Sequence, residues 1–274
     1  MSVSNQSYWG RWAAVAPLAI LSSCSSSVST PIAPRMDVAP YWSAASQRYA
    51  AGDYLKAIGE LDHLLEGPND YTARALPLSL VLTSGVASGY MDLADCYASG
   101  ARANKPKAQA FRRKASVYRA LANHMVLQFA ERAGKIEHLI GNPVQLAFGP
   151  PKGNPSEPAL LSQIANGAEL AQVDEDEAQA LALDRGVLMS AAGAVGAPAN
   201  FVKAISMLQR GEVLAQRAVF VKAMSDLLER ESKLYARDKL DDAAKMDMLR
   251  QLAKSVVTNA PGTQSASVLP IGKL

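Results

Sequence analysis

The sequence predicts an all-α protein built from antiparallel helix pairs, with about eight helices in all. Of its residues 49% are hydrophobic but only 6% are aromatic, and alanine is abundant, which favours closely packed helices over a β-sandwich. Apolar residues in 53–66 recur on one side at helical spacing, and Gly or Pro residues separate the patterned segments. We expect an α-solenoid or a helical bundle.

The N-terminus has the pattern of an export signal. Residues 1–11 are polar with a single basic side chain, Arg11, and residues 12–21 are uncharged and almost wholly apolar. This apolar run is well below the roughly 20 residues that a membrane-spanning helix needs. It ends in Leu21-Ser22-Ser23-Cys24 and is followed by a serine-rich segment.

The Leu21-Ser22-Ser23-Cys24 sequence resembles the lipobox of bacterial lipoproteins. The resemblance implies that 1–23 is a signal peptide, that Leu21, Ser22 and Ser23 are recognised by the signal peptidase, and that Cys24 carries the lipid (palmitate or a similar acyl chain). Residues 24–36 would then be the lipidated cysteine and a flexible tether. Ser25 is not the aspartate that retains such lipoproteins in the inner membrane, which implies an outer-membrane anchor facing the periplasm. A cytosolic protein with an incidental cysteine, or a secreted protein cleaved elsewhere, are the alternatives.

Charge and cysteine content restrict the partners. The net charge of the whole chain is +3, removal of Arg11 with the signal leaves +2, and no basic stripe stands out. Nucleic acid is therefore not an expected partner. With Cys24 acylated, Cys96 has no partner for an intramolecular disulfide, and its apolar helical context predicts a buried, inert thiol.

We expect a first helical half over 37–140. Pro40 lies in the first turn of its first helix, Gly52 ends that helix, and Asp53 caps the next one. An interruption or kink is expected near Pro77, and Gly134 is a possible break in the last helix of this half. The expected helices are 37–51, 53–66, 71–101 and 105–140.

Two small-residue pairs, Ser84-Gly85 and Ser88-Gly89, are four residues apart and so share one face of the third helix. Small side chains allow a second backbone to approach closely, and we expect such an approach here.

The pairing of these helices resembles tetratricopeptide repeats. Gly52-Asp53-Tyr54 with a closing proline is similar to a tetratricopeptide unit, and 93–115 resembles its Sel1-type variant without the second glycine of the Sel1 loop. Gly52 and Gly100 are 48 residues apart rather than 34, so we expect irregular helix pairs rather than a regular array. The resemblance implies packing positions at Tyr49, Gly52, Tyr54, Ala57, Leu93, Ala94, Tyr97, Gly100, Ala108 and Ala115, with Lys107 also in the pattern.

The Gly/Pro-rich segment 141–158 predicts a connector or an exposed loop, and 159–259 a second helical half. Residues 260–274 are expected to be a disordered tail. A break near Gly211 is possible in the third helix of this half. The expected helices lie near 156–167, 174–196, 198–236 and 239–259.

No motif for metal, nucleotide or nucleophilic chemistry is present, so we expect no enzyme activity, no catalytic residues, no metal and no cofactor. His63 is expected to be solvated rather than catalytic, and the isolated His124 and His138 are not expected to bind metal. The run Asp174–Glu177 is expected to be a charged helix start rather than a calcium loop, and Arg112-Arg113-Lys114 a solvated face rather than a ledge for an acidic partner. The histidines are His63, His124 and His138.

The favoured function is a lipid-anchored periplasmic scaffold or adaptor that binds an unknown protein of the cell envelope. One alternative is an accessory transport component, because the run from Ala110 to Leu121 is faintly similar to helical lipoproteins that accompany some TRAP transporters and are thought to pass ligands. Another is a periplasmic enzyme in which His124 or His138 meets carboxylates only in three dimensions.

Overall fold

The computed structural model describes residues 37–136, 144–146, 149, 158–197, 201–209, 213–237 and 251. These all belong to the second of two compact units, Asp37–Leu274, and the first unit is Met1–Met36. The predicted signal peptide, lipobox and tether therefore lie outside the described residues, as do His138, the tail over 260–274 and nearly all of the helix expected at 239–259.

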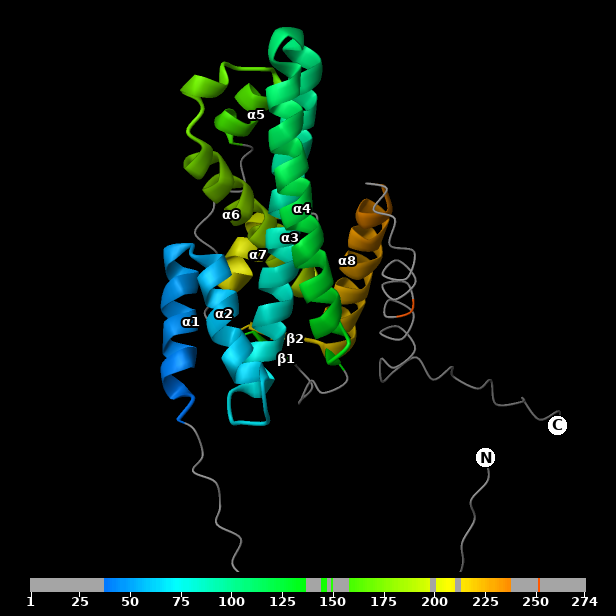
Figure 1. Cartoon of the computed structure of the whole chain (residues 1–274). Helices are drawn as coiled ribbons and strands as arrows, with labels where there is room; N and C mark the ends of the chain where they lie inside the picture. The colour runs from blue at the N-terminus through cyan, green and yellow to red at the C-terminus, as the bar shows by residue number, and fades with distance from the viewer. Residues whose placement is uncertain are drawn as a thin grey trace, which may run out of the picture. The chain divides into compact units, whose positions relative to one another are not determined.

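The all-α fold is confirmed. Eight α-helices and two very short strands are described, with two single turns of 3₁₀ helix at Lys105–Lys107 and Leu170–Gln172. The elements are α1 (Ala39–Ala51), α2 (Tyr54–Leu65), α3 (Thr72–Ala103), α4 (Ala108–Ala133), β1 (Val144–Leu146), α5 (Ala159–Ala165), α6 (Glu175–Ala194), α7 (Phe201–Leu208), β2 (Val213–Ala215) and α8 (Arg217–Arg237), as Figure 1 shows.

Helices α1 and α2 form a tight pair around Gly52. This residue has φ 82°, in the left-handed region that glycine adopts without strain, and its amide donates to the carbonyls of Arg48 and Tyr49. The turn brings the rings of Tyr49 and Tyr54 to a centroid distance of 5.9 Å, and Ala57 is fully buried behind them. The small side chain of Ala57 lets the two helices pack closely.

Helix α3 is the centre of the core. It packs against α2, α4, α5, α6 and α8, which buries residues on all of its faces (Figure 1). The expected interruption near Pro77 was wrong, because α3 is one helix of 32 residues with Pro77 inside it. Pro77 is in the second turn, where the missing amide removes only one early hydrogen bond, and the ring is buried in the core.

The close approach expected at Gly85 and Gly89 is confirmed, and the approaching backbone is that of α6. A Cβ atom on Gly85 would lie 2.5 Å from Val187 Cα, and one on Gly89 would lie 2.5 Å from the carbonyl oxygen of Ala182. Gly186 on α6 meets the backbone of α3 in the same way. Glycines on both helices therefore bring the two backbones into direct contact.

Helix α4 pairs with the second part of α3. Leu93, Ala94 and Tyr97 of α3 are fully buried, as is Phe111 of α4. The fourth helix was predicted to run from 105 toward 140, but a 3₁₀ turn precedes α4, which ends at Ala133 just before Gly134. The described part of the chain contains no helix that is both long enough and apolar enough to cross a membrane.

The two strands join segments that are far apart in the sequence. They pair antiparallel, with Val144 opposite Ala215 and Leu146 opposite Val213. The first strand lies within the expected connector 141–158. The second separates α7 from α8, so the helix expected over 198–236 is divided, as the predicted break near Gly211 allowed. The halves 37–140 and 159–259 lie in one compact unit.

Candidate functional site

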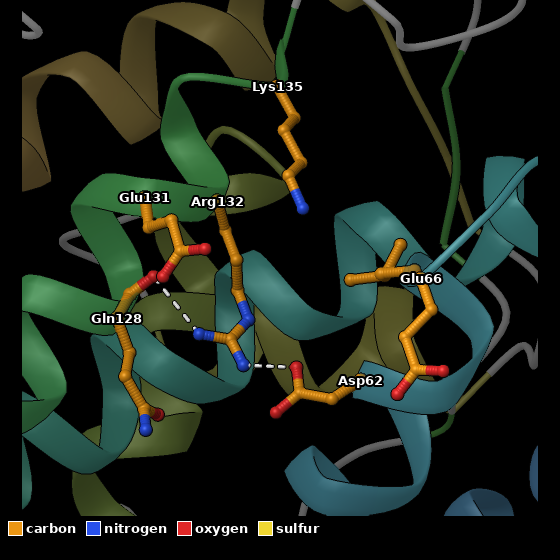
Figure 2. A pocket seen from close by; sticks show the side chains of 7 residues that line it. Asp62, Glu66, Gln128, Glu131, Arg132 and Lys135 are labelled. Carbon is orange, nitrogen blue, oxygen red and sulfur yellow. Dashed lines mark hydrogen bonds and ion pairs between the residues drawn. The ribbon is translucent and has the colours of Figure 1, made fainter.

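A small pocket lies between the end of α2 and the end of α4, with a volume of about 240 Å³. The residues on the α2 side are spaced i, i+3 and i+4, and Glu66 directly follows that helix. On the other side, three lining residues belong to α4, and Lys135 lies just beyond its end. Figure 2 shows the side chains converging from the two helices. The lining residues are Asp62, Leu65, Glu66, Gln128, Glu131, Arg132 and Lys135.

Arg132 forms the buried side of this pocket. Its side chain is only 6% exposed, whereas that of Asp62, with which it forms an ion pair, is 47% exposed. The guanidinium also donates to the backbone carbonyl of Gln128 at 3.0 Å, and both interactions are visible in Figure 2. Its Nε–H is buried without a hydrogen-bond partner among the described residues. Arg132 therefore keeps unused donor capacity after binding Asp62 and Gln128.

Charges of both signs remain uncompensated around Arg132. Lys135 and Glu131 are exposed, and neither forms an ion pair or hydrogen bond in the part of the chain that the structure describes. A hydrogen bond of 3.2 Å joins His63 Nδ1 to the carboxylate of Glu66. Lys135 extends toward the space between Arg132 and Glu66 (Figure 2).

A second polar group lies where α3, α4 and the start of α6 meet. Tyr118 donates to Glu175 Oε1 at 2.8 Å, and Lys114 forms an ion pair with the same carboxylate. The ring of Tyr97 stacks on that of Tyr118 at 5.6 Å, and the Tyr97 hydroxyl is buried with no hydrogen-bond partner among the described residues. Lys114 and Tyr118 both bind the carboxylate of Glu175 and so join α4 to the start of α6, which favours a structural role for this cluster.

Burial controls the ionisation of these tyrosines. It raises the pKa of Tyr97 to about 12, with a further contribution from the negative charge of Glu175. Burial, together with the hydrogen bond to Glu175, also raises the pKa of Tyr118. The pKa of Glu175 is lowered, first by its hydrogen bond from Lys114 and then by the one from Tyr118. All three groups are therefore held in their ordinary charge states at neutral pH.

The two described histidines are exposed, which confirms the solvated position expected for His63. His63 contacts Glu66 and stacks against Tyr41 at 4.6 Å, while His124 shares a hydrogen bond of 3.1 Å with Gln128. Each histidine therefore contacts a lining residue, but neither lines the pocket. Within the described ranges, no three His, Cys, Asp or Glu side chains are grouped closely enough to hold a metal ion.

The acidic run and the basic run predicted as separate features meet in space. Asp174 caps α6 by accepting a hydrogen bond from the Glu177 amide at 3.0 Å, which is the charged helix start that we expected. Lys114 pairs with Glu175 of that start, while Arg112 and Arg113 are exposed. Cys96 is half-buried on α3, so the expectation of a buried thiol was wrong.

The positions assigned to helix-pair packing lie mostly in the core. Gly100 has no room for a side chain, because a Cβ there would collide with the Ile164 carbonyl and the Phe111 ring. Ala108 is only half-buried because it starts α4, and Lys107 is exposed and pairs with Glu169. The buried members are Tyr49, Tyr54, Ala57, Leu93, Ala94, Tyr97, Gly100 and Ala115.

Comparison with protein-family models, with curated proteins and with solved structures gave no match. The candidate site therefore depends on geometry alone. The α2–α4 pocket combines a buried cation, exposed charges of both signs and a defined volume, which are features of a polar binding site.

Sequence reasoning missed this pocket, although one signal for Arg132 was present. The apolar stripe of α4 includes Met125 and Phe129, and a further step of three residues reaches Arg132. A charged residue in register with a buried stripe indicates a partner or a site, because a buried charge without compensation is costly. The partner, Asp62, is on another helix and could not be identified from spacing.

Proposed function

We propose that the chain is a lipid-anchored lipoprotein of the bacterial cell envelope, with a non-enzymatic helical body that acts as a scaffold or adaptor for another envelope protein. The observation that carries the proposal is Leu21-Ser22-Ser23-Cys24 placed directly after a short apolar run. Lipid on Cys24 would fix the body near the membrane, since each buried methylene contributes about 0.8 kcal/mol. Residues 25–36 would be the tether, and the outer membrane facing the periplasm is the proposed location.

The helical body is consistent with an adaptor because its core is well packed and its outer surface is varied. Backbone contact between α3 and α6 makes the centre of the body rigid, and the outer face of α4 carries apolar side chains. On that face Val117 is 58% exposed and Leu121 is 38% exposed, one helical turn apart. Exposed apolar residues on a rigid helix are suited to contact with a protein partner.

The anchoring step is tested by acyl labelling of the full chain in bacterial cells, with Cys24→Ala as the variant and Cys96→Ala as the matched cysteine control. We expect the label and membrane association to be lost only with Cys24→Ala. Equal labelling of all three chains, or none in any of them, would contradict the proposal.

Partner binding is tested by crosslinking and affinity capture from membranes with the full chain. A deletion of 37–121 is unsuitable because it would remove α3, which contacts most of the other helices. We instead expect a double variant, Val117→Ser with Leu121→Ser, to lose a protein that the parent chain captures. A capture pattern unchanged by this variant and by Cys24→Ala would count against the adaptor.

No observation favours either alternative function over this one. An accessory transport component would be supported by an apolar channel, but the α2–α4 pocket is small and lined mainly by charged side chains. A periplasmic enzyme would need His124 or His138 facing carboxylates inside a pocket; His124 is not among the residues that line the α2–α4 pocket, and His138 lies outside the described residues.

A further inference from the structure

The volume of the α2–α4 pocket limits the ligand that it can hold. At about 240 Å³ it exceeds the cavity of roughly 150 Å³ that accommodates a benzene molecule, and it is below the roughly 300–1,000 Å³ of sites for drug-sized ligands. The pocket is therefore suited to a compact molecule rather than to a cofactor or a folded segment.

The lining limits the ligand to a hydrophilic one. Leu65 is the single apolar residue among the lining side chains of this pocket. An apolar ligand would leave the guanidinium of Arg132 and the carboxylates around it without water or a polar partner, which is unfavourable. A polar ligand can replace the water that these groups lose.

The arrangement of charge limits the ligand further. The Arg132–Asp62 ion pair is largely neutral as a unit, which leaves Lys135 as the cation without a counter-charge and Glu131 and Glu66 as the anions. An anion alone would be attracted by Lys135 but repelled by two carboxylates, whereas a cation alone would be attracted by the carboxylates but would leave Lys135 without a counter-charge. A molecule with one charge of each sign meets an opposite charge at both ends.

From these three limits we propose that the α2–α4 pocket binds a small zwitterion of the amino-acid type. Its carboxylate lies against Lys135, and its ammonium lies against Glu131. Charge-assisted hydrogen bonds of this kind are the strongest available to a small polar ligand. The site is independent of the proposed partner-binding role and goes beyond it.

The test is a titration of the full chain, purified in detergent, followed by calorimetry or by ligand-observed NMR. Three probes of nearly the same shape separate the contributions: L-alanine carries both charges, propionate lacks the ammonium and ethylamine lacks the carboxylate. We expect L-alanine to bind in the millimolar range or tighter, at least about tenfold more tightly than either of the other two.

Variants then assign the binding to this pocket. Lys135→Gln and Glu131→Gln change exposed side chains that form no hydrogen bond or ion pair with another described residue, so we expect the fold to be retained. Each should weaken L-alanine binding by about tenfold or more. Lys105→Gln and Glu177→Gln are matched controls on exposed residues far from the lining and should have no effect.

Two outcomes would overturn the proposal. One is the absence of L-alanine binding in the millimolar range, or binding no tighter than that of propionate or ethylamine. The other is binding that Lys135→Gln and Glu131→Gln leave unchanged. Because the titration uses the purified chain alone, its result does not depend on acylation or on partner capture.

Discussion

Replacement of Gly89 by alanine tests the packing between α3 and α6. The added Cβ would lie 2.5 Å from the Ala182 carbonyl oxygen and 2.9 Å from both the Ala182 carbonyl carbon and Leu183 Cα. Ordinary contacts begin at 3.4 Å, so the helices would have to separate locally by about 0.9 Å. The neighbouring atoms are all backbone, and no side-chain rotation can make room for the methyl group.

Two opposing effects determine the change in the free energy of unfolding. Overpacking costs about 1–3 kcal/mol or more, while alanine is favoured over glycine inside a helix by about 0.8–1.0 kcal/mol. Since Gly186 of α6 also contacts the α3 backbone, separation would disturb several contacts at once. We expect Gly89→Ala to lower the free energy of unfolding by about 1–2 kcal/mol, or the melting temperature by about 2–8 °C.

Gly59→Ala is the matched control. Gly59 is inside α2, and a Cβ there would have no neighbouring atom within 4 Å. The only effect left on the free energy of unfolding is the higher helix propensity of alanine compared with glycine. We expect it to raise the free energy of unfolding by about 0.5–1 kcal/mol. Chemical denaturation followed by circular dichroism measures both variants. If Gly89→Ala stabilised the protein as much as Gly59→Ala does, the close approach of α3 and α6 would be refuted.

Three further predictions concern buried polar groups. Tyr97→Phe removes a buried hydroxyl without a partner among the described residues and should raise the free energy of unfolding by up to about 1 kcal/mol at pH 7. Tyr118→Phe loses the hydrogen bond to the half-exposed Glu175 and should lower the free energy of unfolding by about 1 kcal/mol. Urea denaturation in which Tyr97→Phe destabilises the protein and Tyr118→Phe stabilises it would contradict both expectations. Folding raises the pKa of Tyr97 from 10.0 to about 12. The stabilisation that comes from keeping Tyr97 protonated in the folded state is therefore complete below about pH 10 and is lost as the pH rises toward 12. The melting temperature should therefore fall as the pH is raised through this range, and it should fall less steeply for Tyr97→Phe than for the parent chain. Asp62→Ala leaves the guanidinium of Arg132 buried without its carboxylate and should lower the free energy of unfolding by about 1–2 kcal/mol, a value discounted for the 47% exposure of Asp62; an unchanged thermal melt would show that the pair is not stabilising.

The local parts of the fold could be predicted because their causes are local. The stripe of α2 and the glycine that ends α1 specify their helices within one or two residues, since helical spacing and a left-handed turn are properties of adjacent residues. Gly85 and Gly89 likewise predicted a close approach. What they could not predict was the partner, because the complementary glycine, Gly186, is about a hundred residues further along the chain.

The non-local parts were predicted poorly. Strands β1 and β2 have three residues each, too few for an alternating pattern to be detected, and their pairing joins Val144 to Ala215. The same strand pair explains why the helix expected over 198–236 is divided near Gly211, because β2 separates α7 from α8. A three-residue strand is defined by its partner rather than by its own sequence.

The tyrosine cluster around Glu175 and the α2–α4 pocket differ in whether the fold itself pairs their charges. At the tyrosine cluster, Glu175 receives both the Lys114 ammonium and the Tyr118 hydroxyl, so its charge is satisfied by the fold. At the α2–α4 pocket, the ion pair of Arg132 with Asp62 has the same structural role. Lys135 and Glu131, however, line that pocket without contributing to any described hydrogen bond or ion pair. Charges that the fold does not use, placed beside a cavity that it leaves open, are the groups available to a ligand, which is why the binding experiment is directed at these two residues.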